Sequence, residues 1–198
     1  MRYILASNNK GKLKEMKAIL ADLGEDIVSQ GEAGLELEAE ETGTTFEENA
    51  LIKARAACSA LSEPAIADDS GLAVEELNGA PGVYSARYGG EACHNDAERV
   101  QLLLKNLENF EHRRAKFVSC IACILPNGDV INARGECEGE ITAQPRGEGG
   151  FGYDPVFEVS GTGKTMSELS PEEKNAISHR GKALKIFEMK LREYNANK

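Results

Sequence analysis

The chain has 198 residues, of which 33 are acidic and 23 basic, and its formal net charge is −10. That charge argues against a protein that wraps DNA or RNA, because such proteins cover many phosphates with basic side chains. A hydrophobic content of 41% excludes a disordered chain. We expect one globular unit over residues 1–198, folded as a single domain or as two closely joined lobes.

No stretch approaches the ~20 apolar residues that a membrane-spanning helix needs, and no secretory pattern follows Met1. We therefore expect a cytoplasmic protein with no membrane partner. The five cysteines lack the spacing of a disulfide framework, which fits a reducing compartment. Cys120 and Cys123 form a CxxC inside an alternating, strand-like run without a second CxxC, so packed thiols are favoured over a metal or redox site.

The first part of the chain alternates strands and helices. A short apolar run predicts a strand over Arg2–Ala6, and apolar residues at helical spacing predict a helix over Lys12–Leu23. Asp26–Ser29 reads as a second strand. Thr44 and Glu47 then form a candidate capping box that opens a further helix.

That helix is expected to reach about Ser62, and Pro64–Ala67 then predicts a buried strand. The strand runs directly into Asp68-Asp69-Ser70-Gly71, so the two carboxylates are expected at its end. Asn95 with Glu98 caps the next predicted helix.

The second part of the chain contains a predicted hairpin. Phe117–Leu125 and Val130–Ile141 have the alternation of strands, and Pro126–Asp129 between them is a strong turn sequence. Residues 142–155 are rich in glycine and irregular. An N-cap, a proline and a glutamate at Ser170–Glu173 open a C-terminal helical region. Together these elements predict an α/β protein with a mixed sheet, in which the hairpin could form a second lobe.

Residues between the first strand and the first helix are candidates for binding phosphate: Ser7, Asn8, Asn9, Lys10, Gly11 and Lys12. Free backbone N–H groups and the helix dipole favour an anion at such a position. Gly11 permits close approach of the backbone, and Lys12 supplies charge. The alternative is an ordinary strand-to-helix turn capped by asparagine.

A second glycine-rich segment, Gly161–Thr165, ends in GKT like a nucleotide-binding P-loop. That motif requires glycine five positions before the glycine of GK, where this chain has Glu158. A new helix also starts at Ser170 instead of continuing from the lysine. The segment is interpreted as a flexible loop.

The acidic pair Asp68-Asp69 is a candidate metal and catalytic centre. Carboxylates at a strand end lie where open α/β sheets commonly bind ligands, and they can hold Mg²⁺ or take a proton from an attacking water. Residues 25–48 carry nine acidic and no basic side chains, and Glu40 or Glu41 of this stretch could supply a further ligand. The alternatives are an Asp-rich turn and a solvated acidic loop.

A third candidate group follows Gly147, Gly149 and Gly150, where Phe151-Gly152-Tyr153-Asp154 places aromatic rings beside a carboxylate. Such a ring can stack on a nucleobase. The alternative is that both rings pin the loop to the core. Hydrogen-bond donors near the C-terminal helical region are supplied by Lys174, His179 and Arg180.

Taken together, these segments resemble the family of non-canonical purine nucleoside triphosphate pyrophosphatases. The resemblance covers nearly the whole chain in five ordered blocks: ILASNNKGK, EETGTTFEENALIKARAA, PAIADDSGLAVEELNGAPGVYSARYGGE, GGFGYDPVF and SELSPEEKNAISHRGKAL. It implies an elongated α/β fold whose mixed sheet joins two lobes, a nucleotide cleft between the lobes, and a homodimer.

The resemblance also assigns roles to residues. It implies that Ser7 to Lys12 bind the triphosphate with help from Lys53, that Glu41 and Asp69 hold Mg²⁺, and that Ser70 touches the substrate. Asp69 would be the proton acceptor. Phe151, Gly152, Tyr153 and Asp154 would enclose the base, and Lys174, His179 and Arg180 would recognise it.

The expected reaction is Mg²⁺-dependent hydrolysis of dITP, ITP and XTP to the monophosphate and pyrophosphate, which keeps these nucleotides out of DNA and RNA. A nucleotide sensor without catalysis, a pyrophosphatase for modified pyrimidines and a kinase are the alternatives. The sequence leaves open the ranking of the substrates, the number of metal ions, the dimer surface and the basis of GTP rejection.

Overall fold

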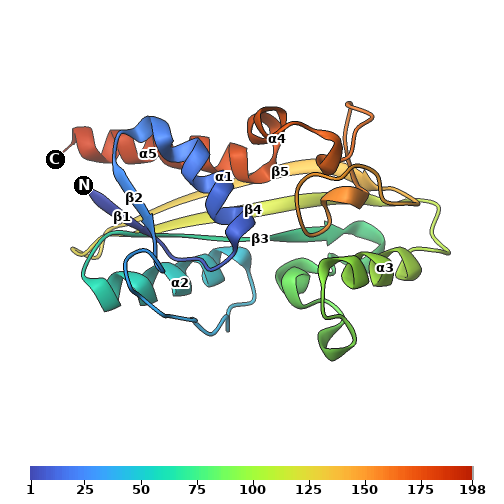
Figure 1. The fold of residues 1–198 in the computed structure, drawn as a ribbon, viewed down its shortest axis with the longest axis horizontal. Helices are drawn as coiled ribbons and strands as arrows, with labels where there is room; N and C mark the ends of the chain where they lie inside the picture. The colour runs from blue at the N-terminus through green and yellow to red at the C-terminus, as the bar shows by residue number, and fades with distance from the viewer. Residues whose placement is uncertain (198) are drawn as a thin grey trace. The chain divides into compact units, whose positions relative to one another are not determined.

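The computed structural model describes residues 1–197 (Figure 1). The chain consists of two compact units. Unit 1 contains residues 1–69, 119–135 and 179–198, and unit 2 contains residues 70–118 and 136–178. Three strands, β3 (Ala65–Val74), β4 (Arg114–Ile124) and β5 (Val130–Ile141), begin in one unit and end in the other. The units are described one at a time.

The strands of the described residues form a six-stranded sheet in the order β2-β1-β3-β4-β5-β6. β1 (Arg2–Leu5) is parallel to both β2 (Asp26–Ser29) and β3, whereas β5 is antiparallel to β6 (Phe157–Val159). The sheet is therefore mixed, as the sequence predicts, and helices flank it.

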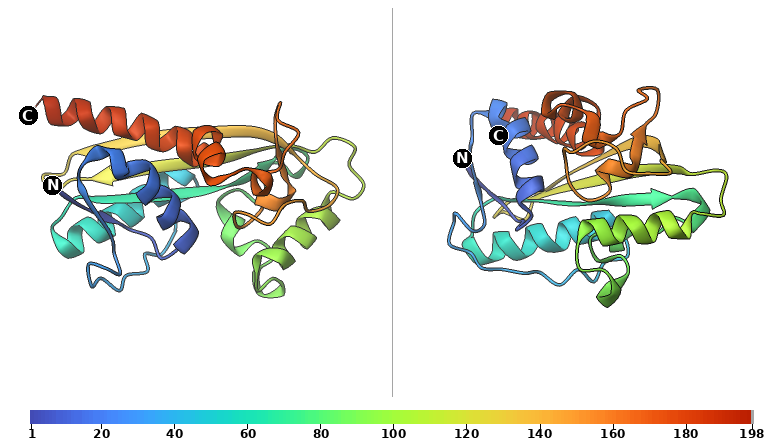
Figure 2. Two further views of the ribbon diagram at one scale, coloured as in Figure 1. Left: turned by 45° about the horizontal axis from the view of Figure 1, so that its top comes forward. Right: turned by 45° about the vertical axis from the view of Figure 1, so that its right-hand side comes forward.

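In unit 1, helices cover both faces of the sheet (Figure 2). α1 (Lys10–Leu20) and α5 (His179–Ala196) pack against each other on one face, and α2 (Phe46–Leu61) covers the other. The core under α1 and α5 is built from apolar side chains of β1, β3, β4 and β5 and of both helices, among them Tyr3, Leu5, Met16, Ile66, Ile121, Leu184 and Phe187.

Unit 2 has its own core between the ends of β3, β4 and β5 and the helix α3 (Asp96–Asn106). Its buried members include Leu72, Leu103, Phe117, Tyr153 and Phe157. α4 (Pro171–Ile177) also belongs to this unit, and Ile177 packs partly buried against the same core. None of the helices in residues 1–197 is long and apolar enough to cross a membrane.

The helix caps predicted from the sequence agree with the structure at two helices and differ by one residue at a third. Asn95 accepts a hydrogen bond from Glu98 N–H at the start of α3, and Ser170 forms a complete capping box with Glu173 at the start of α4. For α2 the prediction was wrong by one residue, because Thr45 and Glu48 form the capping box in place of Thr44 and Glu47.

The limits of other elements also differ from the prediction. α1 begins at Lys10 and not at Lys12, because Asn9 caps it by accepting from Lys12 N–H at 3.0 Å. It ends at Leu20, and a turn of 3₁₀-helix follows over Ala21–Leu23. β4 begins at Arg114, before the predicted Phe117. The second hairpin strand, Val130–Ile141, is confirmed.

The largest correction concerns β3. The strand was expected to end at Ala67, but it continues to Val74, so Asp68, Asp69 and Ser70 lie inside the strand and not at its end. Apolar patterning stops at the first aspartate, whereas the backbone pairing does not. The cause is that cations from other parts of the chain compensate both carboxylates, as described below.

Candidate active site

Asp68 is the centre of a buried charge cluster in unit 1. Its side chain is 0% exposed, and its carboxylate lies 2.7 Å from Lys12 Nζ and 3.2 Å from Arg180 Nη2. Ser119 on β4 donates its hydroxyl hydrogen to the same carboxylate at 2.5 Å. A second carboxylate, Glu15 on α1, pairs with Arg180. The cluster thus joins α1, β3, β4 and α5 through one anion.

This environment sets the charge of Asp68. Burial alone would raise the pKa of the Asp68 carboxyl, but Arg180 and Lys12 outweigh it and hold that pKa well below its usual range. Burial has the opposite effect on the nearby cation, because it lowers the pKa of Lys12. Asp68 is therefore an anion that fixes two cations in place.

Asp69 lies in a different environment from its neighbour. Its Oδ1 is 2.7 Å from Lys53 Nζ, and the same ammonium group contacts Glu41 Oε1 at 2.8 Å. Burial raises the pKa of Asp69 to about 6, although the positive charge of Lys53 opposes that rise. A carboxylate that titrates near neutrality is suited to accept a proton from water.

Strand geometry explains why adjacent acids have different partners. Successive side chains of a strand point to opposite faces of the sheet. Asp68 therefore points toward the face covered by α1 and α5, where Lys12 and Arg180 lie, whereas Asp69 points toward α2, which carries Lys53. The two aspartates cannot act as one bidentate pair.

Glu41 and Asp69 both contact the ammonium group of Lys53, so their carboxylates lie close enough together to be considered as ligands of a divalent cation. Mg²⁺ is commonly bound by one or two carboxylates, with water and substrate phosphates completing its coordination. Residues 1–197 hold no group of three or more histidine, cysteine or acidic side chains arranged for a metal. Glu41 and Asp69 could supply the two carboxylates of such a site, with phosphate and water as the remaining ligands.

The predicted phosphate segment forms the turn between β1 and α1. Ser7 Oγ accepts from Asn9 N–H at 3.2 Å, and Asn8 Oδ1 accepts from Gln30 Nε2–H at 2.8 Å. Lys10, Gly11 and Lys12 are the first turn of the helix. Helix N-termini with free N–H groups bind anions, so this placement agrees with the predicted chemistry.

The start of α5 lies very close to β5, which determines where His179 and Arg180 sit. A Cβ atom on Gly135 would be 2.3 Å from the carbonyl oxygen of His179 and 2.4 Å from the nitrogen of Ala183. Glycine is therefore required at this contact. Both His179 and Arg180 are buried in unit 1.

The third predicted group lies in unit 2. Lys174 Nζ is 2.7 Å from Asp154 Oδ2 and 4.8 Å from the centre of the Phe151 ring. Phe151 N–H donates to the same Asp154 oxygen at 2.9 Å. Gly150 has a positive φ of +74°, and a Cβ atom there would lie 2.1 Å from that oxygen. The loop is thus folded tightly around Asp154.

The two aromatic rings of this loop differ in exposure. Phe151 is half-buried, whereas Tyr153 is 5% exposed and belongs to the core of unit 2. Burial raises the pKa of the Tyr153 phenol, which therefore stays protonated and donates to the carbonyl oxygen of Ser85 at 2.8 Å. Of the two rings, Phe151 is therefore the more exposed, and Tyr153 anchors the loop.

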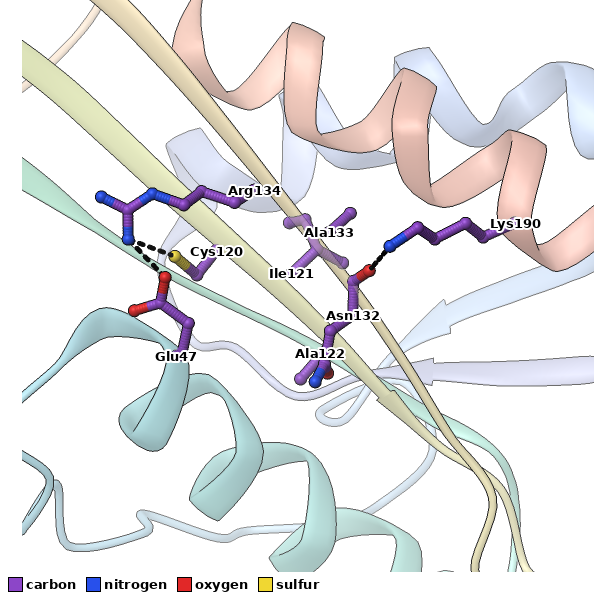
Figure 3. Close-up of a pocket in the computed structure, with 8 residues that line it drawn as sticks. All are labelled: Glu47, Cys120, Ile121, Ala122, Asn132, Ala133, Arg134 and Lys190. Atoms are coloured by element: carbon purple, nitrogen blue, oxygen red, sulfur yellow. Dashed lines mark hydrogen bonds and ion pairs between the residues drawn. The ribbon is translucent and has the colours of Figure 1, made fainter.

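A cavity of about 230 Å³ in unit 1 lies apart from these groups (Figure 3). It is lined by Glu47, Cys120, Ile121, Ala122, Asn132, Ala133, Arg134 and Lys190. Arg134 pairs with Glu47, and Lys190 donates to the Asn132 carbonyl oxygen at 2.7 Å. Cys120 and Cys123 are buried free thiols, and burial raises the pKa of both, which disfavours the reactive thiolate.

Two residues of the Asp68 cluster were missed at the sequence level. Glu15 follows Lys12 by three positions and so shares its helix face, a spacing that could have identified it. Ser119 gave no such indication, because a small hydroxyl in an apolar strand is ordinary and its partner is 51 residues away in the chain.

The cluster predicts how stability depends on pH. Asp68→Asn keeps the size of the side chain but leaves Lys12 and Arg180 without their shared anion, so we expect the free energy of unfolding at neutral pH to fall by about 3–5 kcal/mol. Because the folded-state pKa is depressed, the carboxylate stabilises the fold above its unfolded-state pKa of about 3.9, and this contribution is lost as the pH falls further.

Denaturant unfolding of the wild type and Asp68→Asn at about pH 7 and about pH 3 measures this difference. Asp22→Asn, at an exposed position, is the matched control and should change little at either pH. An equal loss of stability at both pH values would contradict the assigned charge of Asp68.

Comparison with known proteins agrees with these observations. The model of the Ham1 family matches residues 3–190. The dITP/XTP pyrophosphatase of Bacillus subtilis strain 168 is 50% identical over 184 residues, which cover 92% of each chain. The dITP/XTP pyrophosphatase of Escherichia coli strain K12 is 48% identical over 191 residues, covering 94% of this chain and 95% of its own.

Solved structures match over nearly the whole chain as well. A HAM1 protein from Coxiella burnetii has a TM-score of 0.88 at 47% identity, covering 98% of this chain and 99% of its own. The Staphylococcus aureus Ham1 protein has a TM-score of 0.87 at 43% identity, covering 98% of this chain and 100% of its own. The family resemblance inferred from the five sequence blocks is confirmed, and the chain belongs to the Ham1 family.

Proposed function

We propose that the protein is a nucleoside triphosphate pyrophosphatase that hydrolyses dITP, ITP and XTP to the monophosphate and pyrophosphate with Mg²⁺ as cofactor. The observation that carries the proposal is that the adjacent residues Asp68 and Asp69 on β3 have different ionic partners. One carboxylate fixes the cations, and the other, with its raised pKa, lies beside Glu41 in an arrangement suited to a divalent cation. The named activity of the relatives in Bacillus subtilis and Escherichia coli supports it.

The phosphate side of the reaction is assigned to unit 1. Ser7, Asn8, Asn9, Lys10, Gly11 and Lys12 would bind the triphosphate, and Lys53 would add charge. Hydrolysis brings a water to a polyanion, so catalysis depends on positioning and neutralisation of charge. Lys12 is suited to this role because Asp68 and the first turn of α1 hold it in one orientation.

Glu41 and Asp69 would hold Mg²⁺, which when bound neutralises phosphate charge and lowers the pKa of water. Asp69 would accept the proton of the attacking water, and Ser70, the next residue of β3, would contact the substrate. With a metal in this position, Lys53 would exchange its contact with the two carboxylates for one with phosphate.

The base side of the proposal keeps the residues that the family resemblance implies. Phe151 and Gly152 would contact the base, with Asp154 and Tyr153 shaping the loop. Donors facing the purine 6-position would donate to a 6-oxo group. The 6-amino group of adenine is itself a donor, so it would leave them unpaired. Lys174, His179 and Arg180 are the proposed donors, and carboxylates already orient Lys174 and Arg180.

The proposal extends to the setting of the enzyme. A cytoplasmic homodimer that removes altered purine nucleotides before they enter DNA or RNA would need no nucleic-acid or membrane partner. The net charge of −10 is compatible with an anionic substrate when a metal ion lies between carboxylates and phosphates.

The function is tested by incubating the purified protein with ITP, dITP, XTP, GTP and ATP in the presence of Mg²⁺. We expect ITP, dITP and XTP to yield pyrophosphate, with kcat/KM for ATP lower by about 100-fold or more, and EDTA to abolish turnover. Release of orthophosphate, or turnover of ATP as fast as ITP, would contradict the proposal.

Substitution of Asp69 tests the assignment of the base. Asp69→Asn cannot accept a proton, so kcat for ITP should fall by about 100-fold to 10,000-fold, while the KM changes much less. Steady-state kinetics at saturating Mg²⁺ measure both constants. Turnover near that of the wild type would remove Asp69 from this role.

Adjacent glutamates provide a matched test of the metal site. Glu41 contacts Lys53 and is partly buried, whereas Glu40 is exposed. Glu41→Gln should raise the Mg²⁺ concentration needed for half-maximal activity by about tenfold, and Glu40→Gln should leave it unchanged. The reverse order would place the ligand at Glu40.

A further inference from the structure

Ser85 joins segments of unit 2 through its hydroxyl group and its backbone carbonyl oxygen. It lies in a short 3₁₀-helix, Gly82–Arg87, and is 6% exposed. Its Oγ accepts from Leu72 N–H on β3 at 2.9 Å and donates to the Gly82 carbonyl oxygen at 2.7 Å. Its own carbonyl oxygen accepts from the Tyr153 hydroxyl at 2.8 Å.

The link through Tyr153 continues into the loop proposed to meet the base. The backbone N–H of Gly152 donates to Asp96 Oδ2 at 2.8 Å, and that of Asp154 donates to the Phe151 carbonyl oxygen at 3.2 Å. Phe151 is therefore held between a contact to α3 on one side and the buried Tyr153 on the other. A buried phenol that loses its acceptor costs more than a hydrogen bond at the surface, so the Tyr153–Ser85 contact strongly constrains the loop.

We infer that Ser85 is a positioning residue for nucleobase selection. It connects Tyr153 to β3 and thereby fixes the position of the Phe151 ring. This inference rests on the proposed function, because it requires Phe151 to contact the base. Ser85 itself is assigned no contact with the substrate. It lies in the YSARYGG part of the third sequence block.

A positioning role differs from a structural one in its kinetic effect. When the ring is displaced, the base binds less well and less selectively, while the groups assigned to the phosphates are unchanged. The KM for ITP should therefore rise and the ratio of kcat/KM for ITP over ATP should fall, with little change in kcat. A residue that only supported the fold would lower the melting temperature and the fraction of active protein without altering that ratio.

The test is a double-mutant cycle of Ser85→Ala, Tyr153→Phe and the double variant. Tyr153→Phe removes one hydroxyl from the loop, and Ser85→Ala removes the attachment to β3. Each single variant should raise the KM for ITP by about tenfold, the equivalent of one well-placed hydrogen bond. Because both act through one link, the double variant should resemble the single ones, and the effects should not multiply.

Tyr88→Phe is the matched control. It also removes a tyrosine hydroxyl of unit 2 that has a hydrogen-bond partner, because Asn106 donates to Tyr88 Oη at 2.7 Å. Tyr88 lies outside the groups assigned to the substrate, so KM and selectivity should match those of the wild type. A similar loss of selectivity in Tyr88→Phe would overturn the specific role of Ser85.

Hydrogen–deuterium exchange of the ligand-free protein separates the link from the proposed function. Exchange at the backbone amides of residues 151–156 should be faster in Ser85→Ala and Tyr153→Phe than in the wild type, and unchanged in Tyr88→Phe. If the wild type does not hydrolyse ITP, the proposed function fails, while the exchange result still shows whether the link exists. Unchanged exchange, multiplicative effects on KM, or faster exchange with unaltered KM and selectivity would each overturn the inference.

Discussion

The arrangement of unit 1 depends on one buried carboxylate. Asp68 brings together a lysine from α1, an arginine from α5 and a serine from β4, and it does so with a side chain from which water is excluded. Removing such a charge from water costs several kcal/mol, and only close partners offset that cost. The cluster therefore tolerates few alternative arrangements, and the elements that carry these partners have little freedom to shift. Lys12 owes its orientation at the start of α1 to this constraint.

Because side chains alternate along β3, two adjacent residues have different surroundings and different roles. A pair of aspartates in sequence reads naturally as one acidic site, but the pleat of the strand sends Asp68 and Asp69 to opposite faces. One face has the cations that hold the pKa of Asp68 well below its usual range. The other has Lys53 and Glu41, among which the charge of Asp69 is far more easily changed. In a protein with net charge −10, the adjacent aspartates of β3 therefore do not form one acidic group beside the proposed phosphate site.

Local features were predicted well from the sequence, because local chemistry determines them. The caps of α3 and α4 and the strand Val130–Ile141 all follow from spacing within a few residues. The length of β3 did not, because Asp68 and Asp69 look like the end of a strand until their cations are known. Those cations lie 56 and 112 positions from Asp68 in the chain. The anchoring of Tyr153 through Ser85 was hidden for the same reason, since it joins residues 68 positions apart. Contacts of this range depend on the completed fold, which composition and periodicity do not encode.

The order of the segments in unit 1 has a consequence for synthesis of the protein on the ribosome. Residues 1–69 emerge first and include Lys12 and Asp68, whereas Arg180 lies in the last segment, after the whole of unit 2 has been made. Until that segment emerges, Asp68 has only one of its two cations, and the face of the sheet later covered by α5 has no helix over its apolar side chains. Unit 2 is interrupted only by residues 119–135, and its last residue, Ser178, precedes the final segment of unit 1. The unit that begins first is therefore the one that is completed last, and the nascent chain carries its half-compensated charge cluster through most of translation.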